Sequence, residues 1–290
     1  MRYNSENTGR SYRRTSSRNA GSWPRTAHAT TSWSLAEVRL DGLSFAAMTP
    51  SPAFEVAVSR GGATKRSYVR SMFTAIAPRY DFLNHLLSLN VDRRWRRAAV
   101  ARLGWEARRD GVYLDLCAGT LDLAATLARA PGFHGTVIGA DFVVPMLARG
   151  RGKAARTRPV GADALELPFA DAAFDGAMVA FGIRNLADLD AGLREAARVL
   201  KPGARFVVLE FTTPRAAPLR ALYLLYFRRV LPAIGRLVSK HRDAYTYLPE
   251  SVLDFPEPEG LAARFGAAGF RDVRFERLTG GICAVHHGTR

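Results

Sequence analysis

Cysteine is scarce in this sequence, because Cys117 and Cys283 are the only two among 290 residues. Two thiols cannot build a disulfide framework, and without a C-x-x-C pair they do not form the usual structural zinc site. His286 and His287 lie in a predicted strand, where successive side chains point to opposite faces, so they are a poor pair of ligands. We therefore expect a reducing compartment and no metal site, and we interpret the two histidines as polar residues of a frayed C-terminus.

Long hydrophobic segments are also missing. No uninterrupted apolar run reaches the about 20 residues that cross a bilayer, and the first residues lack the apolar centre of a secretory signal. We therefore expect any contact with a membrane to be peripheral.

Acidic residues are too few to balance the basic ones. The chain has 42 Lys and Arg against 26 Asp and Glu, a formal net charge of +16. Such an excess predicts attraction to polyanions, either nucleic acid or an anionic membrane surface. The arginines are scattered over the whole chain, however, which a GC-rich genome alone would also produce. Both interpretations stay open.

The N-terminal segment has almost no acids, since Glu6 is the only one in the first 34 residues, which are rich in Ser, Arg and Thr. It has neither helical nor strand periodicity, so we predict a disordered basic extension over residues 1–63. An organellar transit peptide has the same composition, and translation from Met48 is a third interpretation. We assign residues 64–290 to one domain.

The chain from Thr64 onward reads as a helical cap followed by an α/β domain. Apolar spacing predicts a cap of helices over 64–110, then strands alternating with helices, an aromatic-rich insertion over 212–250 on the substrate side, and a C-terminal antiparallel hairpin. The predicted strands are 111–116, 135–141, 158–163, 174–182, 205–211, 270–278 and 280–288; the helices between them are 120–130, 146–155, 186–200 and 258–268. This order predicts a seven-stranded, mostly parallel sheet with helices on both faces.

The stretch "LDLCAGTLDLA", residues 114–124, has the outline of a cofactor-binding strand, loop and helix. Cys117 and Leu121 stand where such loops usually carry glycine, so the G-x-G-x-x-G spacing of a pyrophosphate site is absent. Gly119 still permits close approach of a ligand, and Thr120 offers a hydroxyl at the helix start. A ligand with a carboxylate and a sulfonium, such as S-adenosylmethionine, needs less of a phosphate cradle.

Polar residues follow consecutive predicted strands, where ligands bind in an open α/β sheet. Asp115 ends the first strand and is expected to accept amide hydrogens of the loop. Asp141 ends the second, about 20 residues beyond the loop, where an acid binds ribose hydroxyls; the alternative is a cap of the next helix. Asp163 and Ala164 end the third strand.

Four segments carry a specific resemblance: "YDFLNHLLSLNVDRRW" (80–95), "FGIRN" (181–185), "RVLKPGARFVVLEFT" (198–212) and "DAYTYLPESV" (243–252). In this order they resemble the ubiquinone/menaquinone biosynthesis C-methyltransferases, and the similarity runs from about residue 67 to the end. The resemblance implies a Rossmann-like class I methyltransferase fold, with S-adenosylmethionine (SAM) as cofactor. It also implies an enzyme that methylates a ring carbon of a demethylated polyprenyl hydroquinone, either demethylmenaquinol or its counterpart in the ubiquinol pathway.

The resemblance also assigns cofactor residues. It implies that Thr120, Asp141, Asp163 and Ala164 contact SAM, and we add Asp115 and Gly119 from the residues themselves. Ala180 replaces the family's serine, and Leu121 replaces its glycine. We expect the Leu121 side chain to add bulk near the methionine end of SAM, so that Leu121→Gly tightens SAM binding.

Arg184 and Asn185 are the predicted catalytic residues. The attacking ring carbon becomes nucleophilic when the neighbouring hydroxyl ionises, which calls for a base or a cation near that oxygen. Arg184 cannot be the base because it stays protonated, so we expect it to stabilise the phenolate or orient a water, with Asn185 positioning the ring. Without the resemblance, a simple turn after the fourth strand explains both residues. Tyr80, Asn84 and Tyr245 are the predicted substrate-binding residues.

The expected partners are the quinol and a membrane surface. The segment 219–238 mixes leucines, aromatics and arginines, which suits a polyprenyl tail at a membrane; a buried helix with snorkelling arginines explains it equally well. We expect no nucleic acid partner. We expect the protein to be cytoplasmic and peripheral to the inner membrane, with organellar import as the lesser alternative. We leave open whether it forms a homodimer. An RNA methyltransferase and a non-catalytic scaffold with the same fold remain alternatives.

Overall fold

The computed structural model describes residues 62–230 and 243–290. The predicted basic extension up to residue 61, and residues 231–238 of the predicted membrane-facing segment, lie outside the described residues.

The described residues form a seven-stranded sheet in the order β3-β2-β1-β4-β5-β7-β6. Its first five strands are parallel, while β7 runs antiparallel to both of its neighbours. The strands are β1 (Val112–Leu116), β2 (Thr136–Asp141), β3 (Thr157–Gly161), β4 (Phe174–Ala180), β5 (Leu200–Phe211), β6 (Arg271–Leu278) and β7 (Cys283–Thr289). The predicted sheet and its antiparallel C-terminal hairpin are confirmed.

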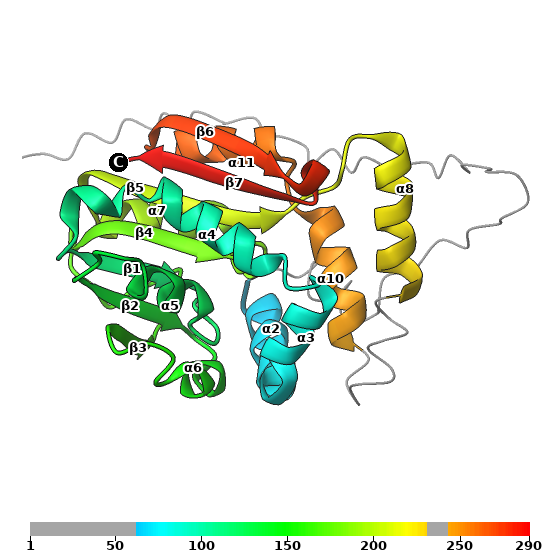
Figure 1. The fold of residues 1–290 in the computed structure, drawn as a ribbon, viewed down its shortest axis with the longest axis horizontal. Coiled ribbons are helices and arrows are strands. Elements are labelled where there is room, and N and C mark those ends of the chain that lie inside the picture. Colours follow the sequence, from blue (N-terminus) through cyan, green and yellow to red (C-terminus); the bar gives the residue numbers. More distant parts are fainter. Residues whose placement is uncertain (1–61, 231–242) are drawn as a thin grey trace, which may run out of the picture. The chain divides into compact units, whose positions relative to one another are not determined.

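Helices cover both faces of the sheet (Figure 1). In β5, Phe206 and Val208 pack on one face among residues of α7 (Leu189–Val199) and α11 (Pro258–Ala267). Val207 between them packs on the other face among residues of α4 (Asp92–Arg102) and α5 (Asp122–Ala128). Because both faces are buried, the strand is a continuous apolar run instead of an alternating one.

Further helices stand at the carboxyl ends of the parallel strands (Figure 1). On this side α2 (Gly62–Ile76) packs against α6 (Val144–Gly150) and α10 (Asp243–Asp254). α2 leads through the short 3₁₀ helix η1 (Ala77–Arg79) into α3 (Tyr80–Leu87). After β5, α8 (Ala217–Leu225) continues into a π-helical turn, η4 (Tyr226–Val230). None of the helices within 62–230 and 243–290 is long and apolar enough to cross a membrane.

Several boundaries differ from the prediction. The helix predicted over 146–155 ends at Gly150, and Gly152 follows with a φ of +82° that a helix cannot continue. The helix predicted from 186 begins at Leu189, because the Asp188 carboxylate caps it by accepting the amide hydrogen of Ala191 at 2.9 Å.

The expectation of a frayed C-terminus is wrong. β7 pairs with β5 on one side and β6 on the other, and His286 is only 1% exposed. Its Nε2 lies 2.9 Å from the carbonyl oxygen of Pro258, and its ring stacks against Phe265 and Phe275. Burial lowers the pKa of His286 to about 4, so the ring is neutral at physiological pH.

Candidate functional site

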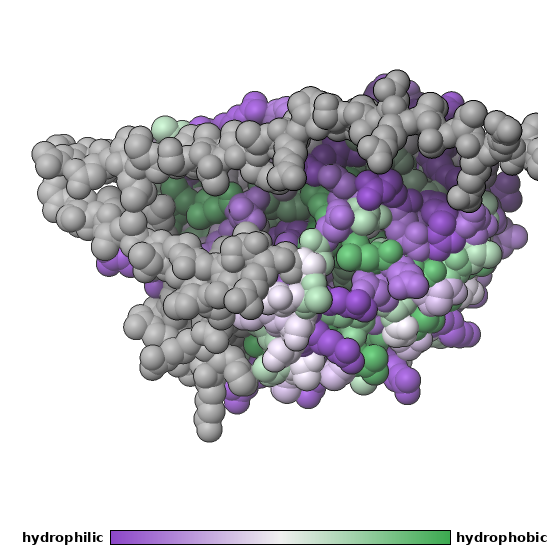
Figure 2. Space-filling view, turned by 180° about the vertical axis from the view of Figure 1, so that it is seen from behind, coloured by the Kyte–Doolittle hydropathy of each residue, from purple (hydrophilic) through white to green (hydrophobic). Residues whose placement is uncertain are grey.

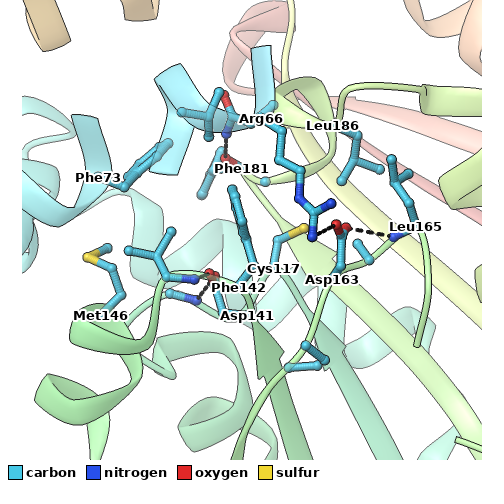
Figure 3. A pocket seen from close by; sticks show the side chains of 18 of the residues that line it. Arg66, Phe73, Cys117, Asp141, Phe142, Met146, Asp163, Leu165, Phe181 and Leu186 are labelled. Atoms are coloured by element: carbon cyan, nitrogen blue, oxygen red, sulfur yellow. Dashed lines mark hydrogen bonds and ion pairs between the residues drawn. The ribbon is translucent and has the colours of Figure 1, made fainter. Parts of the chain in front are cut away.

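A first cavity opens at the carboxyl ends of β1, β2 and β4 (Figure 3). β1 and β4 are neighbours in the sheet although the chain leaves β1 toward β2, so this edge is the topological switch point. The predicted residues that line the cavity are Gly119, Asp141, Asp163, Ala164, Asn185 and Tyr80. The strand ends and α3 therefore bring residues from five separate parts of the sequence together.

Asp141 ties two loops together at this cavity. Its Oδ2 accepts the amide hydrogen of Gly119 and its Oδ1 that of Val143, both at 2.8 Å. Figure 3 shows both bonds at the cavity wall. The carboxylate is 8% exposed, and burial raises its pKa to about 6. Asp141 thus holds the backbone just before α6 and also lines the cavity, and its binding of ribose hydroxyls stays a prediction.

Asp115 and Thr120 are buried beside the loop, and neither lines the cavity. Asp115 Oδ2 accepts the amide hydrogen of Ala124 at 2.8 Å, which holds the first turn of α5. Burial raises the pKa of Asp115 to about 8. Thr120 Oγ1 donates to the carboxylate of Asp81, so its hydroxyl is turned toward α3. Both residues shape the loop from behind.

The expected position of Leu121 is wrong. Its side chain is completely buried in the core between the sheet and α5, and it does not line the cavity. A Cβ added at Gly139 or Gly150 would collide with it, so it fills the space above β2 and beside α6. Its backbone keeps the left-handed conformation typical of glycine, with a φ of +64°. Leu121 thus combines a glycine-like backbone conformation with a side chain that packs in the core.

Asp163 faces an arginine that the sequence analysis did not single out. The guanidinium of Arg66, on α2, lies 2.6 Å from Asp163 Oδ2 across the cavity (Figure 3). Val69 and Phe73 of the same helix complete this wall. The sequence indicated a helix here but not its position over the sheet, so it carried no signal for this wall.

A second, larger cavity of about 500 Å³ lies beside the first. Its walls are mostly apolar and come from α2, α3, α4, α8 and α10. Tyr80 and Asn84 line it, whereas Tyr245 lies in α10 with its side chain outside the described residues. Phe73, Tyr80 and Phe181 line both cavities. The two spaces therefore share a wall at the cofactor edge of the sheet.

Arg184 lines the larger cavity, held by buried partners. Its Nη1 donates to Glu210 Oε1 at 2.7 Å and to the carbonyl oxygen of Phe181, and its Nε donates to Ser251 Oγ at 3.3 Å. Nη2 makes no hydrogen bond to any described residue. In the sequence, the signal for this ion pair is Glu210 itself, an acid inside the apolar run "FVVLEF", which calls for a buried cationic partner.

Asn185 lines the first cavity and is held by α10. Tyr247 donates its hydroxyl hydrogen to Asn185 Oδ1 at 2.8 Å. Arg184 and Asn185 are consecutive in the short helix η3 (Ile183–Asn185), so they face different cavities from one turn. No cluster of three or more metal-ligating side chains occurs within the described ranges.

The fold is that of the class I SAM-dependent methyltransferases. A SAM-dependent methyltransferase from Thermotoga maritima, described as a possible histamine N-methyltransferase, superposes with a TM-score of 0.51 at 18% identity over 76% of this chain and 98% of that one. The [4+2]-cyclase SpnF superposes with a TM-score of 0.57 at 16% identity over 77% of this chain and 95% of that one. These likenesses are of fold alone.

Sequence comparison identifies the family. Residues 62–290 match the ubiE/COQ5 methyltransferase family, and the chain belongs to it. A demethylmenaquinone methyltransferase of Thermus thermophilus is 53% identical over 76% of this chain and 100% of its own length. A ubiquinone/menaquinone biosynthesis C-methyltransferase of Geobacter sulfurreducens is 46% identical over 78% of this chain and 90% of its own. The resemblance inferred from four motifs is confirmed.

Proposed function

We propose that this enzyme transfers a methyl group from SAM to a ring carbon of a demethylated polyprenyl hydroquinone. The observation that carries the proposal is the wall of Phe73, Tyr80 and Phe181 shared by a polar cavity and a large apolar one. A methyl donor in the first and an aromatic ring in the second meet there, which is the alignment that methyl transfer requires. The names of the relatives support demethylmenaquinol as the first substrate to test.

The residues of the first cavity fit SAM. Asp141 and Asp163 present carboxylates to a ligand that carries hydroxyls, an adenine amine and a positive charge, and Gly119 brings backbone close to it. Asp141 would hold the ribose hydroxyls and Asp163 the adenine edge. SAM supplies an electrophilic methyl on its sulfonium. Since Arg66 occupies Asp163 across the cavity, it must turn away for the adenine to reach that carboxylate.

In the second cavity Arg184 stabilises negative charge on the substrate. The Glu210 ion pair fixes the guanidinium of Arg184, which lines the cavity and whose Nη2 makes no hydrogen bond to any described residue. A fixed donor in an apolar cavity favours ionisation of the ring hydroxyl next to the attacking carbon, because the phenolate is stabilised more there than in water. Asn185, held by Tyr247, positions the cofactor side of the ring.

We further propose that the mouth of the larger cavity meets an anionic membrane. Leu89 and Leu222 line this cavity and are 81% and 63% exposed, and Phe82 on α3 is 60% exposed. Figure 2 shows apolar residues gathered on the side of the molecule where α8 lies. Exposed apolar side chains on a chain of net charge +16 suit a lipid surface from which a polyprenyl tail enters.

The test is a methylation assay with SAM and a short-chain demethylnaphthohydroquinone kept reduced, with the demethylbenzohydroquinone in parallel. Mass spectrometry should find one added methyl on a ring carbon, and Arg184→Gln should lower the rate about 100-fold while SAM binding by calorimetry is retained. Binding of SAM without methylation of either ring would refute the proposal. Methyl transfer from SAM to RNA, supplied in a parallel reaction in place of the hydroquinone, would favour the alternative class.

A further inference from the structure

Helix α3 turns apolar side chains outward and polar ones inward. Phe82 and Leu86, one helical turn apart, are 60% and 42% exposed, and Leu89 in the turn that follows is 81% exposed. Asn84 and Ser88, on the opposite side of the helix, line the larger cavity. A helix that borders water has the reverse arrangement, so the outer face of α3 suits an apolar environment.

Two contacts of its polar residues hold α3 in this rotation about its axis. Asp81 forms an ion pair with Lys153 at 2.7 Å, and His85 Nδ1 lies 3.0 Å from Asp92 Oδ2. Both partners belong to other segments of the fold, so α3 cannot rotate without breaking these contacts. The exposure of its apolar face is therefore fixed by the tertiary structure.

The chain around this apolar face is basic. Residues 79–97 contain five arginines and only two aspartates, and each aspartate is already paired with a cation of the chain. Arg93 and Arg94 are exposed at the start of α4 and form no ion pair within the part of the chain that the structure describes. Arg93 comes four residues after Leu89, so their Cα atoms lie within about 14 Å of each other.

Exposed apolar side chains beside unpaired arginines match the boundary between the acyl chains and the phosphates of an anionic bilayer. An apolar helix face sinks about 5–10 Å into this boundary, and arginine side chains are long enough to reach the phosphates above it. A second copy of the chain fits this face poorly, because it would bring the same surplus of positive charge against it.

We propose that α3 and the turn after it dock on an anionic bilayer. Phe82, Leu86 and Leu89 then lie among the acyl chains. Arg93 and Arg94 bind lipid phosphates. The inference rests on the proposed function, because it names the element by which that enzyme reaches a polyprenyl substrate. Leu89 also lines the larger cavity, so this docking brings the cavity mouth to the acyl chains and lets the tail enter without crossing water.

The test is sedimentation of the full chain with vesicles of phosphatidylcholine alone or mixed equally with phosphatidylglycerol. The wild type should bind the mixed vesicles more tightly, and salt should weaken that binding. The double variant Phe82→Gln/Leu86→Gln should bind the mixed vesicles about tenfold more weakly, because less apolar surface leaves water. Arg93→Gln/Arg94→Gln should lose about 30-fold on the mixed vesicles and little on phosphatidylcholine.

The matched control is Arg108→Gln/Arg109→Gln, which removes the same charge from exposed positions just before the amino end of β1. It should bind both kinds of vesicle as the wild type does. Equal losses in the two arginine pairs, or wild-type binding by Phe82→Gln/Leu86→Gln, would overturn the inference. So would self-association without vesicles that disappears in Phe82→Gln/Leu86→Gln, since it would assign the face to a second copy.

The proposed function is tested separately with the short-chain demethylnaphthohydroquinone in solution. Phe82→Gln/Leu86→Gln should keep the wild-type kcat/KM on this substrate, because neither side chain lines a cavity. Failure of the wild type to methylate it would refute the proposed function, whereas failure of the wild type to bind the mixed vesicles would overturn the docking surface.

Discussion

Arg184 Nη1 lies 2.7 Å from Glu210 Oε1, and the side chains are 6% and 1% exposed. The pair joins the turn after β4 to the end of β5, two strands that are neighbours in the sheet. Burial raises the pKa of Glu210, and the guanidinium opposes that shift. A charged pair in such surroundings persists only because each partner is satisfied, so each residue depends on the other.

Glu210→Ala should therefore destabilise the protein by about 3 to 5 kcal/mol, because it leaves the Arg184 charge buried and unpaired. Urea unfolding followed by circular dichroism measures this free energy. The matched control is Glu276→Ala, which breaks an exposed pair with Arg102 and should cost less than about 1 kcal/mol. Equal losses of unfolding free energy in the two variants would contradict the mutual dependence of Arg184 and Glu210.

SAM affinity should depend on the ionisation of Asp141. The folded-state pKa is about 6, and the ionised carboxylate accepts ribose hydroxyls far better than the protonated acid, which has lost part of its acceptor capacity and all of its charge. We expect calorimetry to give a constant Kd above about pH 7 and a Kd that rises about tenfold per unit below pH 6. Asp141→Asn should bind weakly at every pH, whereas Asp163→Asn should bind weakly but keep the break. If the Kd of Asp141→Asn still rises below pH 6, the pH dependence belongs to another titrating group.

Leu121→Gly should weaken the fold without tightening SAM binding. The substitution relieves the cost of a positive φ but empties a fully buried site, so the net loss should be about 2 to 4 kcal/mol. Thermal or urea unfolding measures it, and calorimetry should give a Kd for SAM within about twofold of the wild type, since the side chain lies outside the cavity. Leu253→Ala, at a side chain 54% exposed on α10, is the control and should change neither quantity. A clearly lower Kd for SAM in Leu121→Gly would indicate that the Leu121 side chain restricts the cofactor site.

His286 should contribute less to stability in mild acid than at neutral pH, whereas the raised pKa values of Asp115 and Asp141 act in the opposite direction. The pKa of His286 is about 4 in the folded chain against an ordinary 6.5, so between these values the unfolded chain binds a proton that the folded chain rejects. The stabilising effect is full above about pH 6.5 and is lost as the pH falls to about 4, a change of about 3 kcal/mol. The free energy of unfolding of the wild type minus that of His286→Gln should therefore fall by about 3 kcal/mol from pH 6.5 to pH 4, whereas the same difference for the exposed His134→Gln should not change with pH. A difference for His286→Gln that is independent of pH would locate the proton elsewhere.

The sheet was predictable because its physical requirements are local. β5 reads as a strand because a segment buried on both faces is a continuous apolar run, and that pattern is visible without the fold. The end of α6 was missed because its residues have good helical spacing, whereas the chain leaves the helix before Gly152, which adopts a φ of +82°.

The candidate site divides in the same way. Strand ends predicted where Asp141 and Asp163 would gather, since the carboxyl ends of parallel strands meet at one edge of the sheet. No spacing in the sequence brings Arg66 to Asp163, or Tyr247 to Asn185, because these pairs depend on how α2 and α10 pack over that edge. The position of Leu121 was predicted wrongly for the same reason. The sequence indicated a bulky side chain, but only tertiary packing determines that this side chain lies in the core.

Local periodicity and short motifs in the chain were enough to establish the class of fold, the family and the edge of the sheet where the cofactor cavity lies. Those properties depend on neighbours in sequence and on strand order. The tertiary structure alone decided that a large apolar cavity shares a wall with the cofactor cavity, that Glu210 holds Arg184, and that α3 turns Phe82 and Leu86 outward. Each of these depends on helices distant in sequence packing against one another, an outcome set by shape and burial over the whole core.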